Sequence, residues 1–134
     1  MKKFEILEHK ADLKIRAFGK NKEELFLNML LAMTENQRPE ILPGKVKREI
    51  KISSPELSSL LVDFLSEVLY LTQVNKEVYS EVNFKKFIDT GLKAELVGQK
   101  VESFGEDIKA VTYHSLDIHQ KKDGTWQTTV LFDI

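Results

Sequence analysis

The sequence predicts a single α+β domain, with a mostly antiparallel or mixed β-sheet and two main helices packed on one side of it. Two segments, 22–35 and 54–73, carry apolar residues at helical spacing. Most of the remaining chain alternates between apolar and polar residues, as strands do. Strands and helices mix in the first half, whereas the second half is a long run of strands, and this order is typical of the α+β class.

The composition is that of an ordinary globular protein. The chain has 134 residues, of which 42% are hydrophobic and 31% are charged, so one domain over 1–134 is long enough to bury a core. The absence of cysteine excludes disulfides, thiolate metal sites and cysteine nucleophiles. We recognise no signal peptide and no stretch that approaches the ~20 apolar residues of a membrane span. We therefore expect a cytoplasmic protein with no membrane contact.

The charge balance argues against a protein that binds RNA mainly through phosphate neutralisation. The net charge is -1, from 20 basic and 21 acidic residues, whereas such proteins usually show a basic excess or a dense basic stripe. The basic runs within 45–48 and 85–86 are short, and solvated strand faces explain them at least as well. Any role in RNA chemistry is expected to pass through a protein partner.

The first half of the chain predicts three strands and one helix before the second helical segment. The strands share an alternation of apolar and charged residues and are expected at 2–9, 13–18 and 45–53. In the helix over 22–35, Asn21 is placed as N-cap and Glu24 follows three residues on, a variant of the capping box. Residues 36–44 hold two prolines and a glycine and predict a loop.

The second helix, 54–73, has the broadest apolar surface in the sequence. Ser54 followed by Pro55 predicts its start, because serine caps helices and proline suits the first helical position. Its apolar stripe consists of Leu57, Leu60, Leu61, Phe64, Leu65, Val68 and Leu69. A stripe of this width predicts that the helix packs centrally against a sheet.

Four strands are expected after the second helix, at 77–88, 91–98, 108–120 and 125–133. Asp89-Thr90-Gly91 predicts a hairpin between the first pair, and Lys122-Asp123-Gly124 predicts one between the second pair. No glycine-rich phosphate loop, serine nucleophile elbow or His-Glu-x-x-His zinc helix is present. These absences argue against the common classes of nucleotide-binding enzyme.

The last residues carry two anionic groups on a segment with strand character. Val130, Phe132 and Ile134 share one parity and are expected in the core, so that Asp133 projects from the opposite face. The Asp133 carboxylate and the α-carboxylate of Ile134 then lie within a few ångströms of each other. Two like charges this close need a positive group between them. Either a lysine or arginine, or a hard cation bound by oxygen ligands, meets that need.

Two further polar residues lie between the first two predicted strands. Asp12 shares strand parity with Lys14 and Arg16, so its side chain is expected on the polar face. A turn aspartate that accepts backbone hydrogen bonds is an equally simple interpretation. His9 is more often a satisfied strand-end histidine than a metal ligand.

Several blocks of the sequence resemble the archease family, in the same order along the chain. Glu8-His9-Lys10-Ala11-Asp12 is similar to the family's Glu-His-Thr-Ala-Asp motif, followed by a strand and Gly19. Residues 61–70 fit its second-helix pattern, and the block Ile108–His114 and the ending Trp126–Ile134 are its most specific signals. Two departures are Lys10 in place of threonine and a shorter 102–107 region.

The resemblance implies a non-catalytic partner of the RNA ligase that joins tRNA halves, with no catalytic residue of its own. Archeases promote GTP-dependent guanylylation of that ligase and its multiple turnover. The family's metal site maps onto Asp12, Asp133 and the Ile134 carboxylate. The expected cofactor is a divalent metal, with calcium as first choice and magnesium or manganese as alternatives. The expected partner is the RNA ligase protein, with tRNA contacted only through it.

Three residues are candidates for the rim of this site or a partner-facing position, namely His9, Lys109 and His114. Each also has a structural interpretation, since His114 shares the phase of Ile108 and Lys109 fits a solvated strand. Two other functions remain open. One is a chaperone-like adaptor module without a ligase role. The other is a metal-dependent hydrolase that uses His9, Asp12, His114 and Asp133, although no further acid or base cluster accompanies them.

Overall fold

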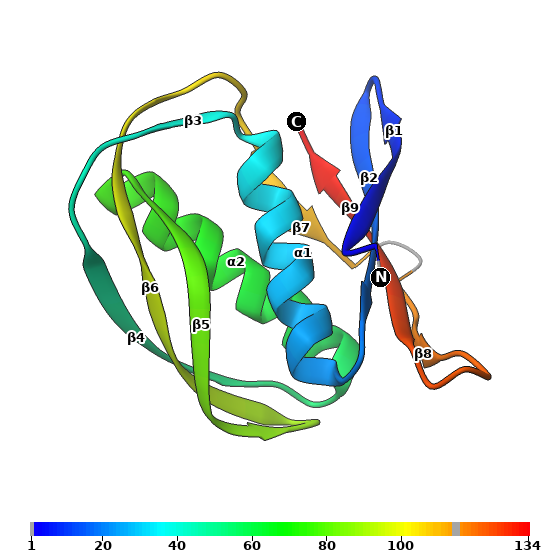
Figure 1. The fold of residues 1–134 in the computed structure, drawn as a ribbon. Coiled ribbons are helices and arrows are strands. Elements are labelled where there is room, and N and C mark those ends of the chain that lie inside the picture. Colours follow the sequence, from blue (N-terminus) through cyan, green and yellow to red (C-terminus); the bar gives the residue numbers. More distant parts are fainter. Residues whose placement is uncertain (1, 114–115) are drawn as a thin grey trace.

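The computed structural model describes residues 2–113 and 116–134, and it has three layers. Two antiparallel sheets form the outer layers, and two helices lie between them (Figure 1). The α+β class and its two helices are therefore confirmed. Each sheet has the helices on one face, as expected, but the strands are divided between two sheets rather than joined in one.

The first sheet contains the strand that leads to the end of the chain. Its members are β1 (Phe4–His9), β2 (Asp12–Gly19), β7 (Ala110–Thr112), β8 (Ile118–Gln120) and β9 (Trp126–Asp133). The order is β1-β2-β9-β7, and β8 also pairs with β9. Strand β9 therefore lies inside the sheet, with β2 along one edge and the short β7 and β8 along the other.

The second sheet is built around one long strand. Its members are β3 (Pro39–Ile41), β4 (Val46–Ser53), β5 (Glu77–Ile88) and β6 (Gly91–Phe104). All three other strands pair with β6, in antiparallel orientation. The turn at Asp89–Thr90 joins β5 to β6, which confirms the predicted hairpin.

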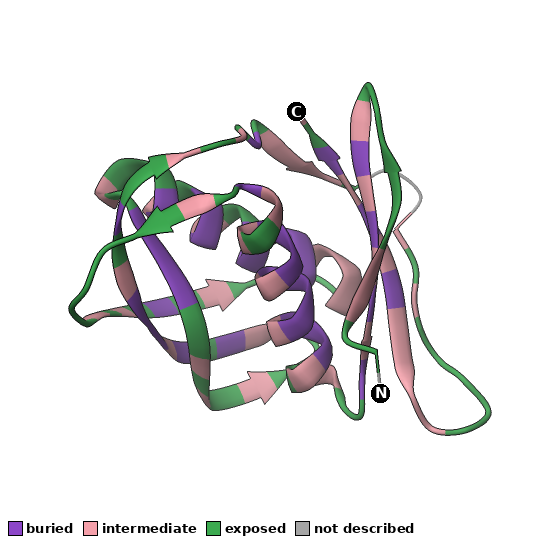
Figure 2. Ribbon diagram, turned by 45° about the horizontal axis from the view of Figure 1, so that its top comes forward, coloured by how far each residue is buried: buried purple, intermediate pink, exposed green. Residues whose placement is uncertain are grey.

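The core lies where the helices meet the inner faces of the sheets (Figure 2). Helix α1 (Lys22–Asn36) packs on β2 and also reaches β5, and α2 (Leu57–Asn75) contacts β4, β5 and β7. Four phenylalanine rings, Phe26, Phe64, Phe84 and Phe87, connect the two helices with β5 at centroid distances of 4.9 to 6.0 Å. These edge-on and tilted contacts add to the apolar burial.

Helix α1 begins as predicted from the sequence. The Asn21 side chain accepts a hydrogen bond from the Glu24 N–H at 2.8 Å, and the Glu24 carboxylate accepts one from the Lys20 N–H at 3.1 Å. The predicted buried stripe is confirmed at Leu25, Phe26, Met29, Leu30 and Met33.

Helix α2 begins later than predicted. It starts at Leu57, with Glu56 as N-cap, and not at Ser54-Pro55. The Ser54 hydroxyl is engaged with side chains farther along, namely Ser59 at 2.6 Å and Asp63 at 2.9 Å. The predicted cap was wrong because these tertiary hydrogen bonds hold Ser54 outside the helix.

Two strand predictions also differ from the structure. Residues 39–41, expected in a loop, form the short strand β3 against the C-terminal end of β6. The segment 108–120, expected as one strand, contains the two short strands β7 and β8, which pair with opposite ends of β9. In both places the pairing partner decides the strand, and local sequence patterns do not report it.

By length and composition, α2 is apolar enough to cross a membrane. This differs from the expectation that no segment approaches such a length. The helix nevertheless lies between the two sheets, and its buried residues are Leu60, Leu61, Val62, Phe64, Leu65, Val68, Leu69 and Thr72. The core helix of a globular protein can be as long and as apolar as a membrane span, so the length and composition of α2 are weak evidence that it crosses a membrane.

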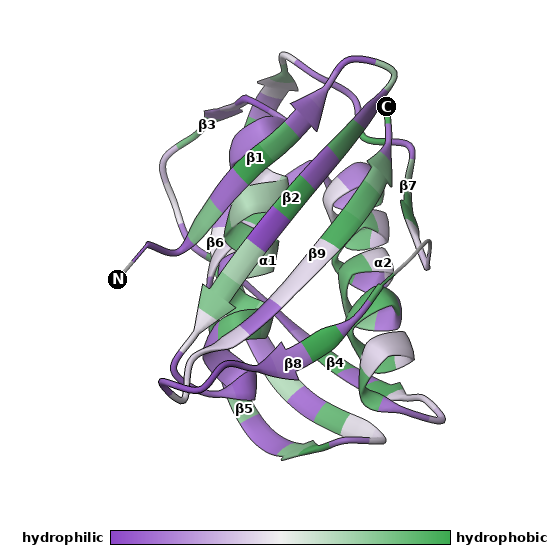
Figure 3. Ribbon diagram, turned by 90° about the vertical axis from the view of Figure 1, so that its right-hand side faces the viewer, coloured by the Kyte–Doolittle hydropathy of each residue, from purple (hydrophilic) through white to green (hydrophobic). Residues whose placement is uncertain are grey.

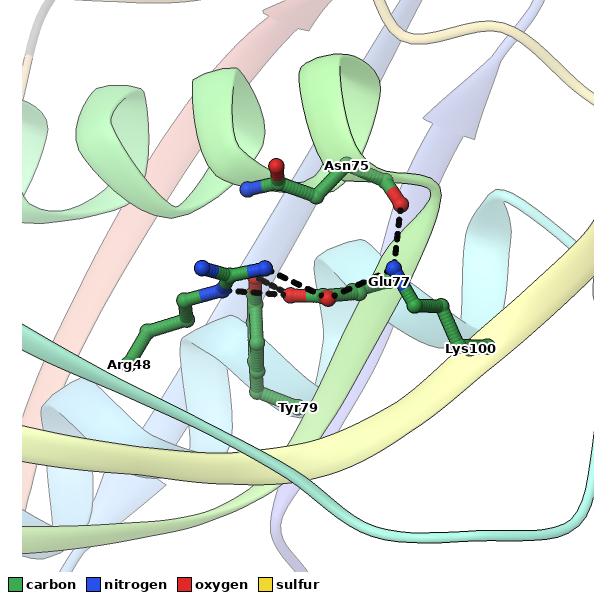
Figure 4. A network of polar contacts seen from close by, with 5 residues as sticks. All are labelled: Arg48, Asn75, Glu77, Tyr79 and Lys100. Atoms are coloured by element: carbon green, nitrogen blue, oxygen red, sulfur yellow. Dashed lines mark hydrogen bonds and ion pairs between the residues drawn. The ribbon is translucent and has the colours of Figure 1, made fainter.

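The second sheet also holds a buried carboxylate, Glu77, at the start of β5 (Figure 4). Arg48 donates two hydrogen bonds to it, at 2.9 and 2.8 Å. The Tyr79 hydroxyl donates a third at 2.8 Å, and Lys100 lies 3.2 Å away while also donating to the Asn75 carbonyl. The bond from Arg48 is the main cause that lowers the pKa of Glu77 to about 2, against the opposing effect of burial.

This carboxylate makes stability depend on acid pH. The pKa of Glu77 is lowered from 4.5 to about 2, so its stabilisation is full above the unfolded value and is lost as pH falls through the folded value. We expect Glu77→Gln to lower the free energy of unfolding at neutral pH by about 2 kcal/mol. That deficit relative to the wild type should shrink as the pH approaches the folded value.

Denaturant unfolding of both proteins over the acid range measures this difference. Glu81→Gln, at an exposed position on the same strand, is the control and should change the free energy of unfolding by no more than about 0.5 kcal/mol. A Glu77→Gln deficit that is the same at acid and neutral pH would contradict the assignment.

Candidate functional site

The pairing of β2 with β9 places two acidic residues opposite each other. Asp12, the first residue of β2, is the Cα partner of Asp133, the last residue of β9. Directly opposed residues of an antiparallel pair point to the same face, with Cβ atoms about 4.5–5.5 Å apart. The burial of β2 alternates from Asp12 onward, with Leu13, Ile15 and Ala17 buried, which confirms that Asp12 lies on the face away from the core.

The end of β9 is anchored by its inward-facing side chains. Val130 and Phe132 are fully buried, and Ile134 packs partly buried against the core. Asp133 between them is exposed. The alternation predicted for the last strand is therefore confirmed at these positions. With Ile134 held in this way, its α-carboxylate follows Asp133 on an ordered backbone at the same end of the sheet as the β1–β2 turn (Figure 3).

The main chain at Asp133 is held from its other edge as well. Strand β7 pairs with β9 there, with Ala110 as the Cα partner of Asp133. The Lys109 N–H donates to the Asp133 carbonyl at 2.7 Å. Because β2 and β7 flank the residue on both sides, its backbone position does not depend on any bound ion.

The two carboxylates have no basic ion-pair partner among the residues that the structure describes. Within residues 2–113 and 116–134, no lysine, arginine or histidine forms an ion pair with Asp12 or Asp133. The next residue on the same face of β2 is Lys14, whose Cα partner on β1 is Glu8. The sequence left open whether a basic side chain or a cation balances these charges, and no basic side chain does so in this part of the chain.

The donor set fits a hard cation only if the terminal carboxylate takes part. Among the described residues, no three His, Asp or Glu side chains gather into a group that could hold a metal. Asp12 and Asp133 supply two carboxylates, and the α-carboxylate of Ile134 is the third anionic group of the predicted set. Oxygen donors of this kind are the ligands that Ca²⁺, Mg²⁺ and Mn²⁺ prefer.

Two of the three candidate rim residues, His9 and Lys109, belong to the described part of the chain. His9 is the exposed last residue of β1, with Leu13 as its Cα partner. Lys109 is exposed and lines a groove of about 190 Å³. The prediction for His114 lies outside the described residues.

The groove beside Lys109 was not anticipated from the sequence. Its lining residues come from α2 and from the start of β7, and are Ser66, Leu69, Tyr70, Gln73, Lys109, Ala110 and Val111. Gln73 donates to the Ile108 carbonyl at 3.0 Å and fixes the spacing of the two elements. The sequence gives no sign that the Gln73 side chain bonds to the Ile108 carbonyl, because the two residues are far apart along the chain.

A second unanticipated contact ties the far end of β7 to α2. The Tyr113 hydroxyl donates to the Asp63 carboxylate at 2.7 Å, and this bond raises the pKa of Tyr113. Asp63 also accepts the hydrogen bond from Ser54. These contacts support β7, and through β7 the backbone of Asp133.

Comparisons with known proteins agree with the motifs. The Archease protein family (MTH1598/TM1083) matches residues 4–134. Protein archease of Methanosarcina barkeri is 39% identical over alignments that cover 99% of this chain and 97% of the relative. The solution structure of Methanobacterium thermoautotrophicum protein 1598 covers both chains completely, with 31% identity and a TM-score of 0.70.

A crystal structure from Thermotoga maritima, described as an archease and possible chaperone, has the same fold. Its TM-score is 0.70 at 22% identity, and the match covers 96% of this chain and 94% of that one. The resemblance stated from the sequence motifs is confirmed by the family match over nearly the whole chain. The chain belongs to the archease family.

Proposed function

We propose that this chain is a non-catalytic, metal-binding accessory protein that activates a tRNA-splicing RNA ligase in the cytoplasm. The observation that supports the proposal is the opposition of Asp12 and Asp133 across β2 and β9. No basic side chain within residues 2–113 and 116–134 is paired with either carboxylate. Family membership supports the partner. The proposal includes promotion of GTP-dependent guanylylation and of multiple turnover.

The metal would be held by Asp12, Asp133 and the α-carboxylate of Ile134. Three anionic groups that converge on a rigid strand end repel one another, so binding of a divalent cation gains the energy of relieving that repulsion. Calcium is the first candidate, with magnesium and manganese as alternatives. When bound, such an ion supplies positive charge that can stabilise phosphate oxygens.

The residues of this chain would present the site to the partner rather than carry out chemistry. Val130 and Phe132 anchor β9 in the core. The hydrogen bond from the Lys109 N–H to the Asp133 carbonyl holds the backbone of the last strand residue in place. The acidic end of the sheet is exposed at Asp133. A ligase that binds GTP and divalent metal would meet this end directly, with tRNA contacted through the ligase.

A second candidate function is a chaperone-like adaptor without a ligase role. The exposed apolar and aromatic side chains of α2, Tyr70 at 58% and Val74 at 61%, favour it, as does the description of the Thermotoga maritima relative. On this alternative the carboxylates are incidental to partner function.

Extension of the C-terminus tests the metal site. Adding a few residues after Ile134 converts its carboxylate into an amide and removes one anionic ligand, so calcium affinity measured by calorimetry is expected to fall at least tenfold. Asp133→Asn removes a different ligand and should do the same. An N-terminal extension of equal length is the control and should leave affinity unchanged. Equal calcium binding by all four proteins would rule out this set of ligands.

Guanylylation of the ligase tests the partner role. Asp133→Ala is expected to reduce the rate at which the chain accelerates transfer of GMP from GTP to the ligase by at least tenfold, because the proposed metal ligand is lost. Glu81→Ala, at an exposed acidic position on β5 in the other sheet, serves as the control and should retain full stimulation. If Asp133→Ala stimulates as well as the wild type, the adaptor alternative is favoured and the metal has no part in activation.

A further inference from the structure

Three lysines lie in register across the second sheet. Lys51 of β4 is the Cα partner of Lys93 of β6, and Lys93 is in turn the Cα partner of Lys86 of β5. All three are exposed. Because neighbouring strands lie about 4.8 Å apart, the row spans about 10 Å from the first Cα atom to the last. We refer to Lys51, Lys93 and Lys86 as the lysine row.

The lysine row lies on the face that the helices leave open. The neighbouring positions Ile50, Leu92 and Ala94 are buried on the inner face, and residues on either side of them along a strand point outward. Both helices lie on the other side of this sheet (Figures 1 and 2). The lysine row is therefore available to a partner without any change in the fold.

Protection of sheet edges explains only part of the lysine row. Lysines on edge strands prevent aggregation by edge-to-edge pairing, and this accounts for Lys51 and Lys86, because β4 and β5 flank β6. It does not account for Lys93, which lies on the central strand. Like charges directly opposite each other are destabilising, so the fold gains nothing from placing a third lysine between the other two.

No acidic side chain compensates the lysine row within the described residues. None of its three members forms an ion pair there. On the same face, Glu49 and Glu95 form the next cross-strand pair. Glu49 is paired with Lys85 at 2.8 Å, whereas Glu95 accepts a hydrogen bond from the neutral Asn83 amide at 3.4 Å. The three lysines therefore form a line of cations without an ion-pair partner among the described residues.

We propose that the lysine row is a binding site for the phosphate backbone of RNA. A line of cations on an open sheet face matches a linear chain of phosphates, and neutralisation of phosphates releases counterions, which drives binding. An anionic bilayer is disfavoured, because a membrane-surface site needs several apolar anchors. Ile88 is the one large exposed apolar side chain at this end of β5.

This contact would be direct, and so it differs from the expectation drawn from the net charge of -1. The net charge of a protein says nothing about how its charged residues are distributed, so it does not reveal that three lysines share one row. The lysine row lies near the β5–β6 turn, at the end of the molecule opposite the C-terminus (Figures 1 and 3). The inference goes beyond the proposed function and does not depend on the metal site.

Fluorescence anisotropy with a labelled single-stranded RNA of mixed sequence tests the inference. The triple variant Lys51→Gln/Lys86→Gln/Lys93→Gln is expected to raise the dissociation constant at least tenfold at low salt. Its plot of log affinity against log salt should be less steep by about 2, since each lost phosphate contact on a single strand removes ~0.7 of slope. The control Lys20→Gln/Lys45→Gln/Lys122→Gln changes net charge equally at dispersed exposed positions and should change affinity by less than threefold.

The thermal stability of the triple variant and RNA binding by Asp133→Asn are measured as controls. The triple variant should melt no lower than the wild type, because it removes like-charge repulsion, and Asp133→Asn should bind RNA as the wild type does. Unchanged RNA affinity in the triple variant, or equal losses in both triple variants, would overturn the inference. So would wild-type protein that binds anionic vesicles of phosphatidylserine and phosphatidylcholine but not RNA.

Discussion

The register between β2 and β9 is the constraint on which the candidate metal site depends. It brings residue 12 and residue 133, at nearly opposite ends of the chain, into one cross-strand pair. A shift of one residue would turn Asp133 toward the core and Phe132 toward solvent, so burial of Phe132 and Val130 fixes the register strongly. The apolar core thereby sets the position of two carboxylates that it does not itself contact.

The same layered arrangement separates the polar features of the two sheets. In the first sheet, the carboxylates of Asp12 and Asp133 oppose each other at one end of two inner strands, and no basic side chain among the described residues pairs with them. In the second sheet, the buried carboxylate of Glu77 has every partner it needs, with Arg48, Tyr79 and Lys100 around it. A satisfied buried network stabilises a structure, whereas uncompensated charges at the surface indicate binding. We therefore assign the Glu77 network to the stability of the fold, and the Asp12 and Asp133 carboxylates to binding.

Much of the fold could be predicted from local patterns. Helix α1 with its Asn21 cap, both hairpin turns and the alternation of β2 and β9 follow from periodicity and turn chemistry. The start of α2 could not, because Ser54 bonds to residues a turn and more ahead. Strand β3 could not either, since Pro39–Ile41 becomes a strand only by pairing with β6. Sequence also gives no division of the strands into two sheets.

Asp12, Asp133 and the Ile134 carboxylate were assigned to one site from the resemblance to the archease family, and the metal site itself stays a prediction. Parity placed Asp12 and Asp133 on polar faces, yet the identity of neighbouring strands is a property of the whole fold, and sequence alone did not pair β2 with β9. The alignment of Lys51 with Lys93 was missed for the same reason, because β4 and β6 are far apart along the chain. Lys86 and Lys93 face each other across the β5–β6 hairpin. In both sheets, strand pairing places like-charged side chains next to each other.

The most direct measurement is a crystal structure grown with Mn²⁺, with anomalous difference density recorded above the manganese edge. We expect one strong peak bounded by carboxylate oxygens of Asp12, Asp133 and Ile134. Density that is absent from this position while the three carboxylates are ordered, or a lysine ammonium lying among them, would contradict it.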